Sequence, residues 1–308
     1  MISVPAAEFS LRTTLASGQS FRWTEQHGWW YGFIGPSALK IRQEGDQLLC
    51  HAADASLDAN RIARYFALDL NLPEIISSIN VDMQIHHAIA QYRGLRVLRQ
   101  DGWETLASFI CASFNNIKRI EGMIDRLCQA YGQPVALTPP PFDVADGGPA
   151  RSAAPNGRAK GGGVNGFRGF SFPAPDTLAA APERRLRSLG LGYRAPYLKA
   201  TARLVADGTL RVEHLQRVGY DATKKALLGC DGVGDKVADC VALFGFEKYE
   251  AFPVDVWMER AMRYYFRHRK TTRKLIHDYA RRHFGPYAGY AQQYLYHYMR
   301  NARPRAAA

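Results

Sequence analysis

The sequence predicts an α+β fold, in which an N-terminal antiparallel β-sheet is followed by an all-helical core. Short aromatic or aliphatic runs, separated by glycine-containing turns, fill the first fifty residues. From about Asp58 the apolar residues change to helical spacing, and helical patterns then continue to Met299. The length of 308 residues suggests about two domains at ~150 residues each.

Four runs in the N-terminal region are expected to form a strand meander, with turns at His27-Gly28 and Glu44-Gly45-Asp46: residues 20–23, 29–34, 39–42 and 48–51. Beyond Asp58, helices are expected from stripes of apolar residues spaced three and four apart. The clearest stripes lie in residues 103–111 and 120–131, and the pattern resumes near Asp176.

Residues 139–170 break all periodicity, with few large apolar side chains and runs of proline and glycine. Such a segment cannot offset its ordering entropy by burial, so we expect a flexible insertion. An inert spacer is favoured over a basic tether that touches DNA. The expected organisation is a sheet domain with following helices at 1–100, a helical core at 101–138 and 171–300, the insertion at 139–170, and a tail at 301–308.

The formal net charge of +12 favours a polyanionic partner, either nucleic acid or an anionic surface. No apolar run reaches the ~18 residues of a membrane span, so no membrane partner is expected, and the N-terminus does not resemble a signal peptide. The odd number of cysteines, five, in an apparently unsecreted chain indicates free thiols in a reducing compartment. They include no C-x-x-C pair with zinc or redox spacing, and no metal site is expected.

Residues 227–244, LLGCDGVGDKVADCVALF, indicate helix, tight glycine turn, helix. Gly232 and Gly234 flank Val233, which can plug between the two helices, and the start of the second helix offers N–H groups to an anion. Lys236 lies in the first turn of that helix, where we expect the helix N-terminus and apolar neighbours to lower its pKa. A neutral amine suits Schiff-base chemistry. The alternatives are an ordinary helical hairpin and a lysine that only binds phosphate.

Asp255 follows in the stretch FPVDVWMER at 252–260 and precedes a helical pattern, so it is a candidate N-cap. Capping alone is one interpretation. A carboxylate beside a neutral lysine amine can instead stabilise a cationic sugar transition state.

These motifs resemble those of the helix-hairpin-helix (HhH-GPD) DNA glycosylase superfamily, in particular its 8-oxoguanine DNA glycosylase/AP lyases. The resemblance covers about residues 10–298 except the insertion, and further matching segments are SGQSFRW at 17–23, GLRVLRQD at 94–101, FICASFNNI at 109–117, LGLGYRA at 189–195 and GPYAG at 285–289. It implies a TBP-like N-terminal sheet domain, excision of 8-oxoguanine from duplex DNA, and strand cleavage by β-elimination. It also implies that the damaged base leaves the helical stack before it is cut.

The resemblance assigns roles residue by residue. Lys236 would form the imine, and Asp255 would support the transition state. Base recognition would involve Gly18, whose carbonyl reads the hydrogen on N7, Gln292 at the Watson–Crick edge, and Cys240 with Tyr296 as a sandwich. The DNA wedge and the orphaned cytosine would be contacted by Tyr193, Arg194, Arg119, Asn115 and Phe114. Phosphate would be bound at Gly232, Val233, Gly234 and Trp257.

Two departures from the family pattern bear on specificity. Phe114 stands where an asparagine contacts the cytosine in eukaryotic members, and a phenyl ring cannot form that hydrogen bond. Trp257 replaces a familiar histidine near the DNA backbone. The resemblance implies no required cofactor, allows a structural cation at the hairpin, and is compatible with a monomer in the cytoplasm and nucleoid of a bacterium or the nucleus of a eukaryote. The alternatives are a related glycosylase for another damaged base and a non-catalytic DNA-binding protein.

Overall fold

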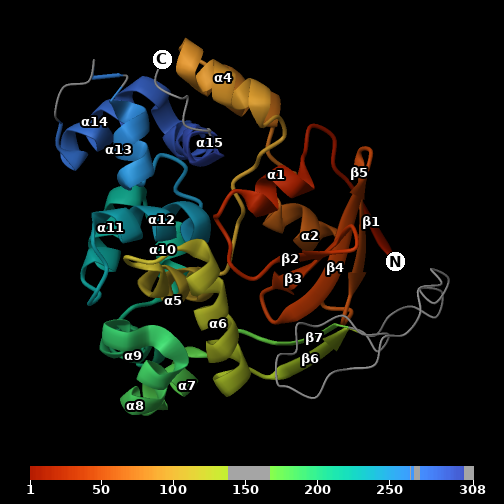
Figure 1. Ribbon diagram of the computed structural model, residues 1–308, viewed down its shortest axis with the longest axis vertical. Coiled ribbons are helices and arrows are strands. Elements are labelled where there is room, and N and C mark those ends of the chain that lie inside the picture. Colours follow the sequence, from red (N-terminus) through yellow and green to blue (C-terminus); the bar gives the residue numbers. More distant parts are fainter. Residues whose placement is uncertain (138–166, 264, 267–270, 302–308) are drawn as a thin grey trace, which may run out of the picture.

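The computed structural model describes residues 1–137, 167–263, 265–266 and 271–301. A twisted sheet and its covering helices form one side of the molecule, and a larger helical body forms the other (Figure 1). The predicted α+β fold, with the sheet preceding the helices, is confirmed. No helix in the described part of the chain is long and apolar enough to cross a membrane.

The N-terminal sheet has the strand order β1-β5-β4-β3-β2, and every neighbouring pair is antiparallel. Its strands are β1 (Ile2–Pro5), β2 (Thr24–Gln26), β3 (Trp29–Ile34), β4 (Ser37–Glu44) and β5 (Gln47–Ala52). One face buries Leu39, Ile41 and Leu48 against helices α1 (Leu11–Ala16) and α2 (Ala59–Tyr65). This small core makes the sheet a platform for the helical body.

Three of the four expected strands are found, but the expected strand at residues 20–23 is wrong. The chain there is irregular, and β2 starts one residue later, at Thr24. The aromatic residues serve as anchors instead: Trp23 is buried, and its indole Nε1 donates a hydrogen bond to the Tyr65 hydroxyl at 2.9 Å. Strand β1 and helix α1, which Ser10 caps, were not predicted.

The helical body begins after α2 and contains the second, larger core. Its α-helices are α3 (Leu72–Ile79), α4 (Met83–Gln91), α5 (Gly102–Ala112), α6 (Ile117–Tyr131), α7 (Pro175–Ala180), α8 (Glu183–Leu186), α9 (Ala195–Ala206), α10 (Val212–Arg217), α11 (Tyr220–Leu228), α12 (Asp235–Phe246), α13 (Val256–Met262), α14 (Arg273–Phe284) and α15 (Ala288–Asn301). Shorter turns are η1 (Arg187–Leu191), η2 (Gly192–Arg194) and η3 (Gly285–Tyr287). The central helices α5 and α12 pack together, and α15 lies against α13 and α4.

Strands β6 (Pro134–Leu137) and β7 (Phe167–Phe170) form a separate antiparallel pair. Most of the predicted insertion at 139–170 lies outside the described residues, as does most of the predicted tail at 301–308. Its last residues were wrongly assigned, because β7 pairs with β6 and the Phe170 carbonyl accepts a hydrogen bond from Arg22. The pair lies beside β4 of the N-terminal sheet (Figure 1).

Candidate active site

The predicted hairpin joins α11 to α12. Gly232 has a φ of +78°, and a Cβ there would lie 2.6 Å from Cδ2 of Tyr197, so both conformation and space require glycine. Val233 is buried in the main core. Gly234 is the N-cap of α12 and supplies no side-chain acceptor. The first-turn N–H groups of α12 therefore have no side-chain cap and can bind an anion.

Lys236 lies in the first turn of α12 and is partly buried. Its Nζ is 5.3 Å from the centroid of the Phe109 ring on α5. Burial acts to lower the pKa of Lys236, but the acidic groups of Cys240 and Asp255 outweigh burial and raise it. The predicted lowering of this pKa is therefore wrong for the DNA-free protein. The reason is tertiary: α12 and α13 place two acidic groups beside the amine.

Asp255 is the N-cap of α13, as predicted. Its Oδ1 accepts hydrogen bonds from the backbone N–H groups of Trp257 at 3.0 Å and Met258 at 2.9 Å. Oδ2 takes no part in this cap. The carboxylate is also close enough to Lys236 to raise the pKa of the amine. Capping fixes the carboxylate in place, and the same group is then available to a developing positive charge.

Cys240 and Tyr296 lie close to this pair. Cys240 is 4% exposed, and burial raises the pKa of its thiol to about 11, so the sulfur is uncharged at neutral pH. The charges of both Lys236 and Asp255 act on the Tyr296 hydroxyl, whose pKa burial raises. The structure thus brings α12, α13 and α15 together around one group of functional side chains.

Gly18 reaches the same site from the N-terminal domain. It has a φ of +82°, and a Cβ there would lie 3.6 Å from Cε1 of Tyr296 and 2.9 Å from Cδ1 of Ile117. Gln292 precedes Tyr296 by one turn of α15 and is 5% exposed. Its Oε1 is buried without a hydrogen-bond partner in the described structure. A buried acceptor left unpaired is costly, so Oε1 is a candidate to bind a ligand donor.

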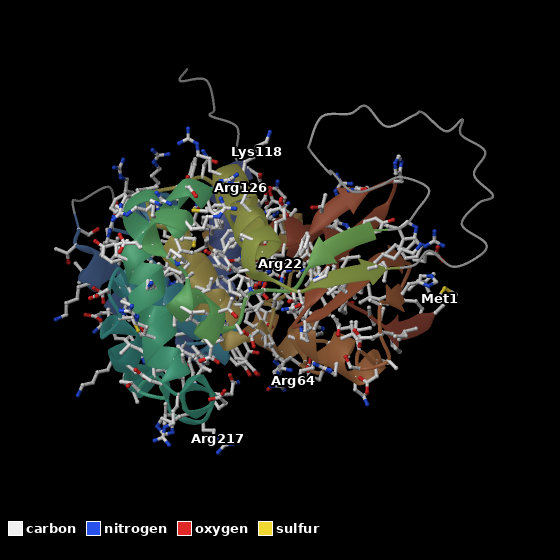
Figure 2. The ribbon with its side chains drawn as sticks, turned by 90° about the horizontal axis from the view of Figure 1, so that it is seen from below. Met1, Arg22, Arg64, Lys118, Arg126 and Arg217 are labelled. Atoms are coloured by element: carbon white, nitrogen blue, oxygen red, sulfur yellow. The ribbon has the colours of Figure 1, made fainter. Side chains whose placement is uncertain are left out.

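A second site opens between α6 and η1 as a cavity of about 450 Å³. It is lined by Phe114, Asn115, Lys118, Arg119, Gly122, Met123, Arg126, Gly190 and Arg194. Phe114 is 99% exposed and has a φ of +50°, and Arg119 is exposed. Figure 2 shows Lys118 and Arg126 on the same side of the molecule and Arg217 on the far side. The cavity combines positive charge with an exposed aromatic ring.

Arg194 and Tyr193 are held at the edge of this cavity. Arg194 Nε donates to the Ser113 carbonyl at 2.9 Å, and its guanidinium lies 4.3 Å from the centroid of the Tyr193 ring. Tyr193 is exposed and its hydroxyl is 3.4 Å from the same carbonyl. These contacts orient both side chains before any DNA is bound.

The geometry thus gathers Lys236, Asp255, Cys240, Tyr296 and Gly18 at one place. The residues expected at the orphaned base gather at another. Trp257 follows Asp255 at the start of α13 and is partly exposed, with the Arg260 guanidinium 4.8 Å from the centroid of one of its rings.

Three residues near these sites were not predicted from the sequence: Phe109 under Lys236, Tyr197 against Gly232, and Lys118 in the cavity. Phe109 and Lys118 carried a sequence signal, because Phe109 opens the matched segment at 109–117 and Lys118 follows it directly, whereas nothing in the sequence pointed to Tyr197.

Comparison with known proteins identifies the family. Residues 1–106 match the model of the 8-oxoguanine DNA glycosylase N-terminal domain, and residues 107–285 match that of the HhH-GPD superfamily of base excision DNA repair proteins. The N-glycosylase/DNA lyase OGG1 of Arabidopsis thaliana is 30% identical over 94% of this chain and 77% of its own length. A probable N-glycosylase/DNA lyase of Methanothermobacter thermautotrophicus is 28% identical over 97% of this chain and 96% of its own.

A solved structure gives the same result. The 8-oxoguanine glycosylase/lyase of Clostridium acetobutylicum, bound to double-stranded DNA with cytosine opposite 8-oxoguanine, superposes with a TM-score of 0.82. It is 29% identical, and the match covers 95% of this chain and 92% of that one. The chain described here belongs to the HhH-GPD superfamily of base excision DNA repair proteins, within its N-glycosylase/DNA lyase branch.

Proposed function

We propose that this enzyme flips 8-oxoguanine out of duplex DNA, excises it, and cleaves the abasic strand through a Schiff base on Lys236. The observation that carries the proposal is the meeting of Lys236 with Asp255 beside Cys240 and Tyr296. A DNA-binding module that used the hairpin only for phosphates would have no need for a carboxylate fixed next to a buried amine. Family membership in the glycosylase/lyase branch supports the same assignment.

The raised pKa of Lys236 fits a specific sequence of proton transfers. As the bond between C1′ and N9 breaks, the purine leaves with the electron pair and takes a proton from the ammonium. The amine that results attacks the oxocarbenium carbon C1′, and a proton passes from its nitrogen to O4′ as the C1′–O4′ bond breaks, which opens the sugar ring to a protonated imine. Loss of a proton from C2′ then expels the 3′ phosphate. Asp255 stabilises the cationic sugar before the new bond forms.

In this proposal, the base lies between Cys240 and Tyr296. The Gly18 carbonyl accepts the N7–H that oxidised guanine has and guanine lacks, a difference of roughly 1–3 kcal/mol when its absence leaves a buried acceptor unpaired. Gln292 meets the Watson–Crick edge, and its unpaired Oε1 supports this role.

The basic cavity would receive the orphaned base, with Arg119 and Arg194 as donors and Tyr193 as the wedge. Phe114 and Asn115 would contact the same strand. Backbone N–H groups from Gly232 to Lys236, with Trp257 nearby, would hold phosphate. The chemistry needs no cofactor, and a structural cation at the hairpin is compatible with it. We place the enzyme in the nucleoid of a bacterium or the nucleus of a eukaryote.

Trapping of the imine tests the proposal. On a duplex that contains 8-oxoguanine, borohydride should link the wild-type protein to DNA and should fail to link Lys236→Gln. Lys225→Gln is the matched control, because Lys225 is an exposed lysine of the neighbouring helix α11. It should be trapped as the wild type is. Normal trapping by Lys236→Gln would contradict the assignment of Lys236 as the residue that forms the imine.

A further inference from the structure

Arg300 carries a buried donor that the proposed function has not used. It lies near the end of α15, and its Nη1 is buried without a hydrogen-bond partner in the described part of the chain. A cationic donor buried without an acceptor is costly, because it has lost water and gained nothing in return. An incoming ligand with an acceptor at this position would remove that cost.

Arg300 lies beside the base slot, our name for the site that contains Gly18, Cys240, Asp255, Gln292 and Tyr296. Gln292, Tyr296 and Arg300 follow one another at intervals of four residues, so they share one face of α15. Nη1 of Arg300 is 2.9 Å from the point where a Cβ on Gly18 would lie, and Cε1 of Tyr296 is 3.6 Å from the same point. Nη1 therefore lies where Gly18 meets the Tyr296 ring.

A carboxyl group near Arg300 leaves Nη1 unused. Glu121 on α6 is partly buried, and burial raises the pKa of its carboxyl while the charges of Arg300 and Lys118 act to lower it. This carboxylate acts on the guanidinium through space, and neither residue has a hydrogen bond or a short ion pair to the other among the described contacts. Nη1 of Arg300 therefore lies near α6 and keeps a donor available.

We infer that Arg300 is a base-recognition residue, whose Nη1 donates a hydrogen bond to a carbonyl oxygen of the flipped, oxidised purine. The inference rests on the proposed function, in which the Gly18 carbonyl accepts the N7–H of that base. N7 of 8-oxoguanine lies between two carbonyls, at C8 and C6. A donor adjacent to Gly18 is therefore near an acceptor on either side of N7. The C8 carbonyl exists only in the oxidised base.

Replacement of Arg300 by leucine tests the inference. Single-turnover excision of 8-oxoguanine opposite cytosine should slow about tenfold to a hundredfold, the loss expected for one hydrogen bond to a charged donor. Cleavage of a duplex with a preformed abasic site should stay within about twofold of wild type, since no base is present. Arg217→Leu is the control: it removes the same charge from an exposed site on the side of the molecule opposite Lys118 and Arg126 (Figure 2), and both activities should be retained.

Two results would overturn the inference: excision by Arg300→Leu at the wild-type rate, or an equal loss of excision and abasic-site cleavage, which indicates a structural role. Failure of the wild-type protein to excise 8-oxoguanine would instead refute the proposed function. A duplex with 8-oxoadenine then identifies the oxygen, because this base keeps the C8 carbonyl but has an amino group at C6. A loss on both bases supports the C8 carbonyl, and a loss confined to 8-oxoguanine supports the C6 carbonyl.

Discussion

The base slot and the basic cavity differ in burial and in how far apart their residues lie along the sequence. The slot is built from buried or partly buried groups on four distant segments, including Gly18, Cys240, Asp255 and Gln292. The cavity is lined by residues between 114 and 126, in and just before α6, and by Gly190 of η1 and Arg194 of η2. It presents exposed groups such as Phe114 and Arg119. Enclosure strengthens each electrostatic contact in the slot, whereas solvent weakens those of the cavity.

The comparison predicts a division of labour. Choice of base and bond cleavage need groups that are fixed and desolvated, so a single substitution in the slot should have a large effect. Attraction to the DNA backbone comes from many exposed cations, so a single substitution in the cavity should have a small effect that depends on salt.

Asp255 should separate chemistry from folding. Asp255→Asn keeps an oxygen that can cap α13 but removes the negative charge, so excision should fall about a hundredfold to a thousandfold with little change in stability. Because Asp255 raises the pKa of Lys236, its loss should also lower that pKa. Asp255→Ala should lose the cap as well, at about 0.5–2 kcal/mol in the free energy of unfolding. Single-turnover rates and urea unfolding measure both, and full activity of Asp255→Asn would contradict the catalytic role.

Gln292 should govern the choice of base without affecting salt dependence. Gln292→Leu keeps most of the side-chain volume but removes the buried Oε1, so excision of 8-oxoguanine should fall about tenfold. The slope of log affinity against log salt should stay at the wild-type value, because no cation is lost. A changed slope would show that this residue acts through the DNA backbone.

Arg119 should have the opposite pattern. Arg119→Ala should reduce the slope of log affinity against log salt by about one if the side chain neutralises one phosphate. The ratio of excision opposite cytosine to excision opposite adenine should fall, because a donor to the orphaned base is removed. Rates measured opposite each of the four bases check this result. An unchanged ranking would assign opposite-base choice to Arg194 alone.

His297 on α15 should make the stability of the protein sensitive to acid. Burial, aided by the charge of Arg300, lowers the pKa of His297 from 6.5 to about 4, so the folded protein keeps the imidazole neutral. The unfolded chain binds a proton below pH 6.5, and the free energy of unfolding should therefore decrease as the pH falls from 6.5 toward 4. The contribution is about 1–3 kcal/mol. His297→Gln should flatten this part of the pH profile, whereas the exposed His214→Gln should not; equal profiles would contradict the prediction.

Much of the fold was predictable because its signals are local. The strand at residues 29–34, the glycine turn before α12 and the cap at Asp255 each follow from residues next to one another. The prediction of a strand at residues 20–23 was wrong because Trp23 packs against a distant residue, Tyr65, rather than against a neighbouring strand. The prediction for residues 167–170 at the end of the insertion was wrong for a similar reason, because β7 forms by pairing with β6.

The sequence by itself determined the family and the order of sheet and helices, and it singled out the candidate lysine and aspartate, because these depend on residue types at fixed spacing. Only the tertiary structure decided the charge state of Lys236 and the donor available at Arg300. Both properties depend on how helices α12, α13 and α15 pack against one another and against Gly18. The spacing of residues along the sequence does not determine these distances. Desolvation and neighbouring charges are properties of that packing.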